Sequence, residues 1–96
     1  MKPSLALEAN RDAVRALVAK RRIENPRVFG SVARGEDEEG SDLDLLVDAL
    51  PGATLLDLCG LQIDLEDLLG FKVDVVTPEE LPRRIKGAVL AEARAL

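Results

Sequence analysis

The stretch from Phe29 to Asp48 constrains the fold of this chain more than any other segment. It begins with an apolar residue followed by Gly30 and Ser31, and it closes with Asp42 and Asp44 at the head of an apolar run. A surface strand would alternate polar and apolar residues along its whole length. Here the aspartates stand at the start of the run, which predicts a strand that places both at a sheet end and its remaining residues in the core.

The remaining sequence predicts helices that alternate with short strands. The first helix would begin at Ser4 and stop at Asn25-Pro26, because the residue before a proline avoids helical geometry. We expect helices over 4–23, 32–34, 54–69 and 83–92, and strands over 27–29, 42–47 and 71–76. This order predicts an α/β (α+β) fold in which about three strands form a small sheet with helices against one face, as a single domain over residues 1–96.

The helix expected over 54–69 carries apolar residues on nearly all of its sides, although a surface helix needs only one apolar stripe. Two interpretations stay open: part of this helix is a protein interface, or the fold buries it on two sides. Its single cysteine, Cys59, has no partner for an internal disulfide. We therefore expect the protein to reside in the reducing cytoplasm. We also expect Cys59 to be a small core residue and not a reactive thiol, because no cationic residue stands next to it in the sequence.

The composition argues against several classes of function. A formal net charge of −5 is unlike a domain that holds long nucleic acid by neutralising its phosphates, although it is compatible with a small nucleotide held through metal ions. The chain has no histidine, which removes histidine-containing triads, His-ligated zinc and histidine bases. Catalysis would then need carboxylates with metal, or lysine. No apolar run is long enough to span a bilayer, so we expect no membrane contact.

Three aspartates form the candidate metal site. Asp42 and Asp44 stand two positions apart on a strand, so they share one face, with Cα atoms about 7 Å apart. Their carboxylates can converge on magnesium, a hard cation that takes oxygen ligands and completes its shell with substrate phosphates. Asp74 lies within the Val-rich strand over 71–76 and is costly to bury without a partner. We expect Asp74 to be the third metal ligand and to accept the proton of an attacking hydroxyl.

Gly30, Ser31 and Arg34 form the candidate phosphate site. The glycine lets the backbone approach a phosphate closely, and the serine hydroxyl and nearby N–H groups can donate to phosphate oxygens. Arg34 is the only cation between Phe29 and Asp48. Arg34 can contact a triphosphate, or it can pair with the acidic loop over 36–39, which we expect to be exposed, and the sequence leaves both roles open.

The motif G-S-V-A-R-G, followed after five residues by S-D-L-D-L-L-V, resembles the nucleotidyltransferase motif of the DNA polymerase β superfamily. The chain is as short as the minimal nucleotidyltransferase group, and the resemblance covers nearly all of it. It implies a small mixed sheet and transfer of a nucleoside monophosphate, with ATP as the expected substrate and two Mg²⁺ ions as cofactors. It also implies that Gly30 and Ser31 bind phosphate, while Asp42, Asp44 and Asp74 bind metal.

The same resemblance implies a partner, because minimal nucleotidyltransferases are commonly paired as antitoxins with a small helical HEPN toxin. Some transfer AMP to a tyrosine of that toxin, and since this chain has no tyrosine, such a modification could occur only in trans. We expect an adenylyltransferase of this kind. One alternative is an antitoxin that neutralises its toxin by complex formation alone. Another is modification of a small-molecule hydroxyl, against which the lack of a second substrate-binding domain counts.

Overall fold

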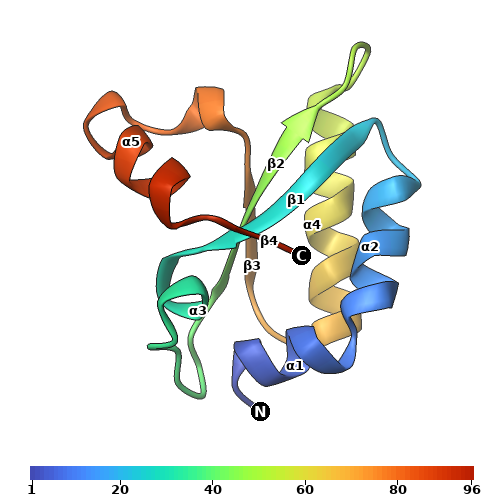
Figure 1. Ribbon diagram of the computed structural model, residues 1–96. Helices are drawn as coiled ribbons and strands as arrows, with labels where there is room; N and C mark the ends of the chain where they lie inside the picture. Colours follow the sequence, from blue (N-terminus) through green and yellow to red (C-terminus); the bar gives the residue numbers. More distant parts are fainter.

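The computed structural model describes residues 1–96, and its strands form one four-stranded sheet in the order β3-β2-β1-β4 (Figure 1). Strands β1 and β2 are antiparallel, as are β1 and β4, whereas β2 and β3 are parallel. The sheet is therefore mixed, as expected. The strands are β1 (Ile23–Phe29), β2 (Leu43–Ala49), β3 (Val73–Val76) and β4 (Arg94–Ala95). The helices are α1 (Pro3–Ala9), α2 (Arg11–Ala19), α3 (Gly30–Arg34), α4 (Leu55–Leu69) and α5 (Arg83–Glu92), with a short 3₁₀ helix, η1 (Pro78–Glu80).

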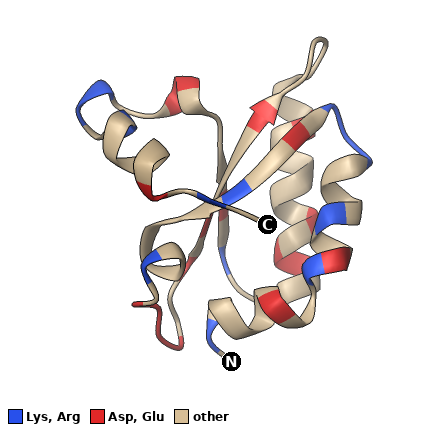
Figure 2. Cartoon of the chain, in the orientation of Figure 1, with Lys and Arg blue, Asp and Glu red and all other residues tan.

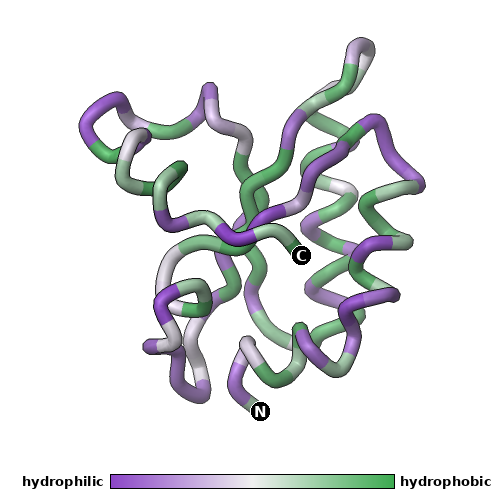
Figure 3. The backbone as a smooth tube through the Cα atoms, in the orientation of Figure 1, coloured by the Kyte–Doolittle hydropathy of each residue, from purple (hydrophilic) through white to green (hydrophobic).

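The core lies between the sheet and the two helices α2 and α4. Leu43, Leu45 and Val47 of β2 point into it, and each is fully buried. Leu61 and Leu65 of α4 are equally buried and belong to the same cluster. In Figure 3, where the backbone is coloured by residue hydropathy, apolar residues recur along β2, β3 and α4 near the centre of the molecule. The period-two alternation expected for β2 is confirmed, and it turns Asp44 to the other face of the sheet.

Helix α5 stands on the opposite side of the sheet from α2 and α4, where it contacts α3 (Figure 1). The expectation that all helices cover one face is therefore wrong for α5. Thr77 and Glu80 form a capping box at η1. Helix α5 begins at Arg83, after Pro82, as expected. What the local sequence did not indicate is that α5 crosses to the face on which Asp44 lies.

The first helix differs from the expectation, because α1 and α2 are separate and meet at Asn10. The side-chain amide of Asn10 donates to the carbonyl oxygen of Ala6 at 2.8 Å, and its backbone N–H donates to Ala6 and Leu7. These bonds close α1. At the N-terminal end of α1, Pro3 lies in the first turn, so Ser4 is not the N-cap.

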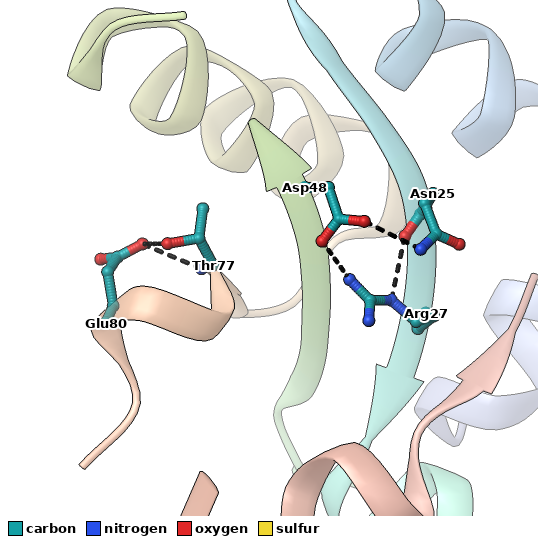
Figure 4. A network of polar contacts seen from close by, with 5 residues as sticks. All are labelled: Asn25, Arg27, Asp48, Thr77 and Glu80. Atoms are coloured by element: carbon teal, nitrogen blue, oxygen red, sulfur yellow. Dashed lines mark hydrogen bonds and ion pairs between the residues drawn. The ribbon is translucent and has the colours of Figure 1, made fainter. Parts of the chain in front are cut away.

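Strand β1 begins at Ile23, four residues earlier than expected, and includes Pro26. A break in the register between Glu24 and Arg27 accommodates the proline, which cannot donate to a sheet ladder. Figure 4 shows what holds this irregular segment: Arg27 donates to Asp48 of β2 at 2.6 Å, and Asn25 donates to the same carboxylate at 2.9 Å. Three polar side chains thus join β1 to β2 where backbone pairing is interrupted.

Helix α4 is buried on one side only, so the interpretation that the fold buries it on two sides is wrong. It begins with a capping box between Thr54 and Asp57 and ends at Gly70. Gly60 leaves room for the guanidinium of Arg21, which bonds Asp64 at 2.8 Å. The outer side of α4 carries the large exposed apolar residues Leu55, Leu56, Ile63 and Leu68.

Cys59 lies on this exposed side of α4 as a free thiol, and the expectation that it is a core residue is wrong. In the structure as a whole, no helix combines the length and the apolar character that crossing a membrane requires.

Candidate active site

The parallel pairing of β2 and β3 places Asp44 and Asp74 directly beside each other. They are register partners, and both are half-buried on the face turned away from the core. Asp42 lies one residue before β2 begins and is exposed. Alternation and the parallel register together place Asp44 and Asp74 side by side near the start of their strands, with the exposed Asp42 just before β2.

The carboxylate of Asp44 is perturbed by burial and by its acidic neighbours. Burial raises the pKa of Asp44, and the negative charges of Asp74 and Asp42 raise it further. The ammonium of Lys72 lies 4.0 Å from a carboxylate oxygen of Asp42 and 4.0 Å from one of Asp74. Negative charge is thus concentrated at Asp44, and a cation placed among the three carboxylates would relieve it.

The side chains nevertheless do not form a group of three or more His, Cys, Asp or Glu residues arranged to hold a metal ion. Asp42, Asp44 and Asp74 agree with magnesium in ligand type, since all three supply carboxylate oxygens. They also agree in charge, because burial raises the pKa of Asp44 and the negative charges of Asp74 and Asp42 raise it further. The donor set therefore fits a divalent cation in ligand type and in charge, while the three side chains do not converge on one point.

Gly30 lies directly against Asp44. Its φ is +72°, in the left-handed region that favours glycine, and a Cβ at this position would stand 2.2 Å from an oxygen of the Asp44 carboxylate. Only glycine therefore fits here without a shift of Asp44. This contact joins the two sequence motifs, Gly30-Ser31 and Asp42-Leu-Asp44, into one site.

Arg34 and Glu92 complete the surroundings of Gly30. The backbone N–H of Gly30 donates to Oε1 of Glu92 at 2.7 Å, and Arg34 contacts the two oxygens of the same carboxylate at 3.2 and 3.1 Å. Arg34 also pairs with Glu36 of the acidic loop, and these two glutamates raise the pKa of Arg34. Ser31 is half-buried beside Gly30. Sequence reasoning missed Glu92, because nothing in the pattern of α5 marks it.

The acidic loop is only partly exposed, contrary to expectation. Figure 2 shows its acidic residues gathered below α3, next to the N-terminus of the chain. Asp37 is buried and accepts the N–H of Ser4 at 2.8 Å, while Glu39 pairs with the terminal ammonium at 2.9 Å. The loop thus fastens α1 to the site region.

The site is open. The three surface hollows of the molecule lie elsewhere, and none is lined by Asp42, Asp44 or Asp74.

Residues 11–96 match the family model described as a nucleotidyltransferase domain. The chain belongs to this nucleotidyltransferase family. It is 40% identical over 77 residues to a candidate protein adenylyltransferase of Methanocaldococcus jannaschii, a match that spans 80% of this chain and 83% of that relative. It is similar to a solved structure described as a candidate minimal nucleotidyltransferase, with a TM-score of 0.82 at 47% identity over 97% of this chain and 93% of the other.

The fold also matches a solved toxin–antitoxin structure with AMP-PNP, at a TM-score of 0.75. That match covers 90% of this chain and 71% of the other, and its 20% identity shows a common fold alone. The family, the mixed α/β fold and the assignment as a nucleotidyltransferase are therefore confirmed for this minimal nucleotidyltransferase domain. The roles of its individual site residues stay predictions.

Proposed function

We propose that this nucleotidyltransferase transfers AMP from ATP to a hydroxyl of a partner protein. One observation carries the proposal: Asp44 stands between Asp74, its register partner on β3, and Gly30, which touches its carboxylate. This arrangement supports the proposal that the predicted metal-binding and phosphate-binding residues act as one site. The relative from M. jannaschii, which is described as a candidate protein adenylyltransferase, supports the nature of the transferred group.

In this proposal Gly30 and Ser31 hold the triphosphate. The Gly30 N–H and the Ser31 hydroxyl donate to phosphate oxygens, and Arg34 supplies a positive charge beside them. Asp42, Asp44 and Asp74 would hold Mg²⁺, with two ions as the expected number. When bound, such ions neutralise the charge that develops on the reacting phosphate.

The transfer forms a bond between the acceptor hydroxyl oxygen and the α-phosphorus, and it breaks the bond from that phosphorus to the pyrophosphate. Pyrophosphate leaves with the bonding electrons. Asp74 takes the proton of the attacking hydroxyl, because it stands on the strand next to Asp44 and is half-exposed toward an incoming acceptor.

We assign the acceptor to a tyrosine of an HEPN-type toxin in the cytoplasm, which makes this domain the antitoxin. The toxin–antitoxin structure that shares its fold supports this context. The chain itself has no tyrosine, so the acceptor tyrosine must come from another protein. The open site beside β3 is compatible with a protein acceptor that brings its own surface.

A second candidate function is neutralisation of a toxin by complex formation without transfer. The outer side of α4 favours it, because Leu55 and Leu56 are 70% and 80% exposed and lie near exposed Ile63. This apolar side belongs to the helix that covers the face of the sheet opposite Asp44. A protein held there could be bound without being modified.

The test compares Asp44→Asn with Asp12→Asn, a matched change at a fully exposed aspartate of α2. Each variant is incubated with α-labelled ATP, Mg²⁺ and the co-purified partner. We expect Asp44→Asn to reduce labelling at least about 100-fold, as is usual when a group that stabilises the transition state is lost. Asp12→Asn should label at the original rate. Equal labelling by both variants would refute the site.

An assay of cell protection from the toxin distinguishes the two candidate functions. A double Asp42→Asn, Asp44→Asn variant should fail to protect cells from the toxin if transfer is the function, and it should still protect them if complex formation suffices. A Leu56→Asp variant on the outer side of α4 should show the reverse pattern.

A further inference from the structure

The carboxylate of Glu92 occupies the place that the proposed function assigns to a phosphate. Oε1 of Glu92 accepts the Gly30 N–H at 2.7 Å and lies 3.2 Å from Nη1 of Arg34, while Oε2 lies 3.1 Å from the same nitrogen. A carboxylate and a phosphate present similar anionic oxygens to backbone N–H groups and to arginine. The donors expected to bind the nucleotide are therefore already engaged by a residue 62 positions further along the chain.

We propose that Glu92 is an intramolecular substitute for a nucleotide phosphate, and that a triphosphate must displace it to reach Gly30 and Arg34. This inference rests on the proposed function, since it concerns the same phosphate site. It assigns Glu92 a role that neither the motif nor the three aspartates supply: it weakens nucleotide binding until the triphosphate competes successfully.

The charges around Glu92 support competition rather than cooperation with a triphosphate. The Gly30 N–H and the positive charge of Arg34 hold the pKa of Glu92 below its ordinary value, so the carboxylate is ionised at neutral pH. Glu92 also adds to the negative charge that raises the pKa of Asp44. A phosphate that arrived while Glu92 stayed in place would meet two carboxylates and would find its donors occupied.

The position of Glu92 restricts how it can leave. It is the last residue of α5, and the segment after it continues into β4, where Arg94 and Ala95 pair with β1. The backbone at Glu92 is therefore held on both sides. Its side chain is 27% exposed, so rotation of the side chain toward solvent frees the Gly30 N–H without unpairing β4.

The test measures binding of inorganic triphosphate, and separately of ATP, to the full chain in the presence of Mg²⁺ by isothermal titration calorimetry. Glu92→Gln keeps the shape of the side chain and loses the charge, while Glu92→Ala also loses the hydrogen-bond acceptor. The matched control is Glu8→Gln, which removes the same charge from an exposed glutamate that bonds Arg11 at 2.7 Å. Far-UV circular dichroism confirms that each variant is folded.

We expect both Glu92 variants to bind inorganic triphosphate about five- to tenfold more tightly than the original chain, the range for loss of a competing, partly exposed charge-assisted hydrogen bond. Glu8→Gln should bind within about twofold of the original affinity. If Glu92→Ala does not fold, the comparison is carried by Glu92→Gln, because it preserves the side-chain volume.

Equal or weaker binding by the folded Glu92 variants, with normal binding by the original chain, would overturn this inference alone and would make Glu92 a residue that positions Gly30 and Arg34. Binding by a Glu92 variant where the original chain shows none would support it most directly. If no variant binds triphosphate or ATP, the phosphate site itself is refuted, and the proposed function fails with it.

Discussion

Replacement of Gly30 by alanine tests the contact that joins the two halves of the site. The new Cβ would stand 2.2 Å from a carboxylate oxygen of Asp44, whereas non-bonded heavy atoms settle at about 3.5–4.0 Å. The carboxylate of Asp44 must then move by roughly 1 Å or more to restore an ordinary contact. Asp44 is fixed by its place in β2 between Phe29 and Asp74, so its side chain has to rotate away.

Gly35 provides a matched control for this change. Its φ is +71°, almost the same as the +72° of Gly30, but a Cβ there would meet nothing within 4 Å. Alanine in the left-handed region costs about 1–2 kcal/mol at either position. The backbone strain is therefore common to both variants, and only Gly30→Ala disturbs Asp44.

The two variants should therefore separate stability from function. Both should lose about 1–2 kcal/mol of unfolding free energy in urea, followed by far-UV circular dichroism because the chain has no tryptophan or tyrosine. Gly30→Ala alone should lose Mg²⁺ affinity in calorimetry and reduce AMP transfer about 100-fold, the effect of a displacement near 1 Å at a reacting centre.

The reasoning fails if Gly30→Ala binds Mg²⁺ and transfers AMP as well as Gly35→Ala does. It also fails if Gly35→Ala loses transfer to the same extent, because backbone strain would then account for the whole effect.

Two further predictions concern stability. Because burial and two nearby carboxylates raise the pKa of Asp44, its ionisation opposes folding, and this cost develops as the pH rises from the ordinary value of 3.8 through the raised pKa. Asp44→Asn should therefore raise the urea midpoint of the metal-free domain at pH 7, with a smaller gain toward pH 4, while Mg²⁺ should stabilise only the original chain. Leu61→Ala, at a fully buried position of α4, should cost about 2–5 kcal/mol of unfolding free energy, whereas Leu56→Ala, at an 80% exposed position, should stay within about 0.5 kcal/mol in the same urea titrations.

Local signals in the sequence were enough for most of the fold. The apolar alternation after Asp44 predicted which side of β2 faces the core, and Pro26 and Pro82 lie next to the ends of predicted helices. Each of these signals operates within a few residues. Strand periodicity also predicted that Asp44 and Asp74 face away from their apolar neighbours, whereas their side-by-side placement depends on the parallel register of β2 and β3, which joins distant parts of the chain.

Most errors arose where contacts between residues distant in the sequence determine the local structure. The break of the first helix at Asn10 is the exception, because the side chain that closes α1 bonds Ala6, only four positions away. Burial of Asp37 depends on the N–H of Ser4, 33 positions away. Glu92 was missed for the same reason, because its role depends on its contacts with Gly30 and Arg34, which are distant in the sequence.

The two faces of the sheet separate the two candidate functions of this domain. Asp44 and the residues around Gly30 lie on the side of α5, whereas α4, with its exposed apolar side, covers the opposite face. A toxin bound on α4 can be neutralised while the site stays free. An acceptor hydroxyl must instead reach Asp44 and Asp74 on the face that carries α5. That face also carries the carboxylate of Glu92, which accepts the Gly30 N–H, so an acceptor and a nucleotide would meet on the side of the sheet opposite α4.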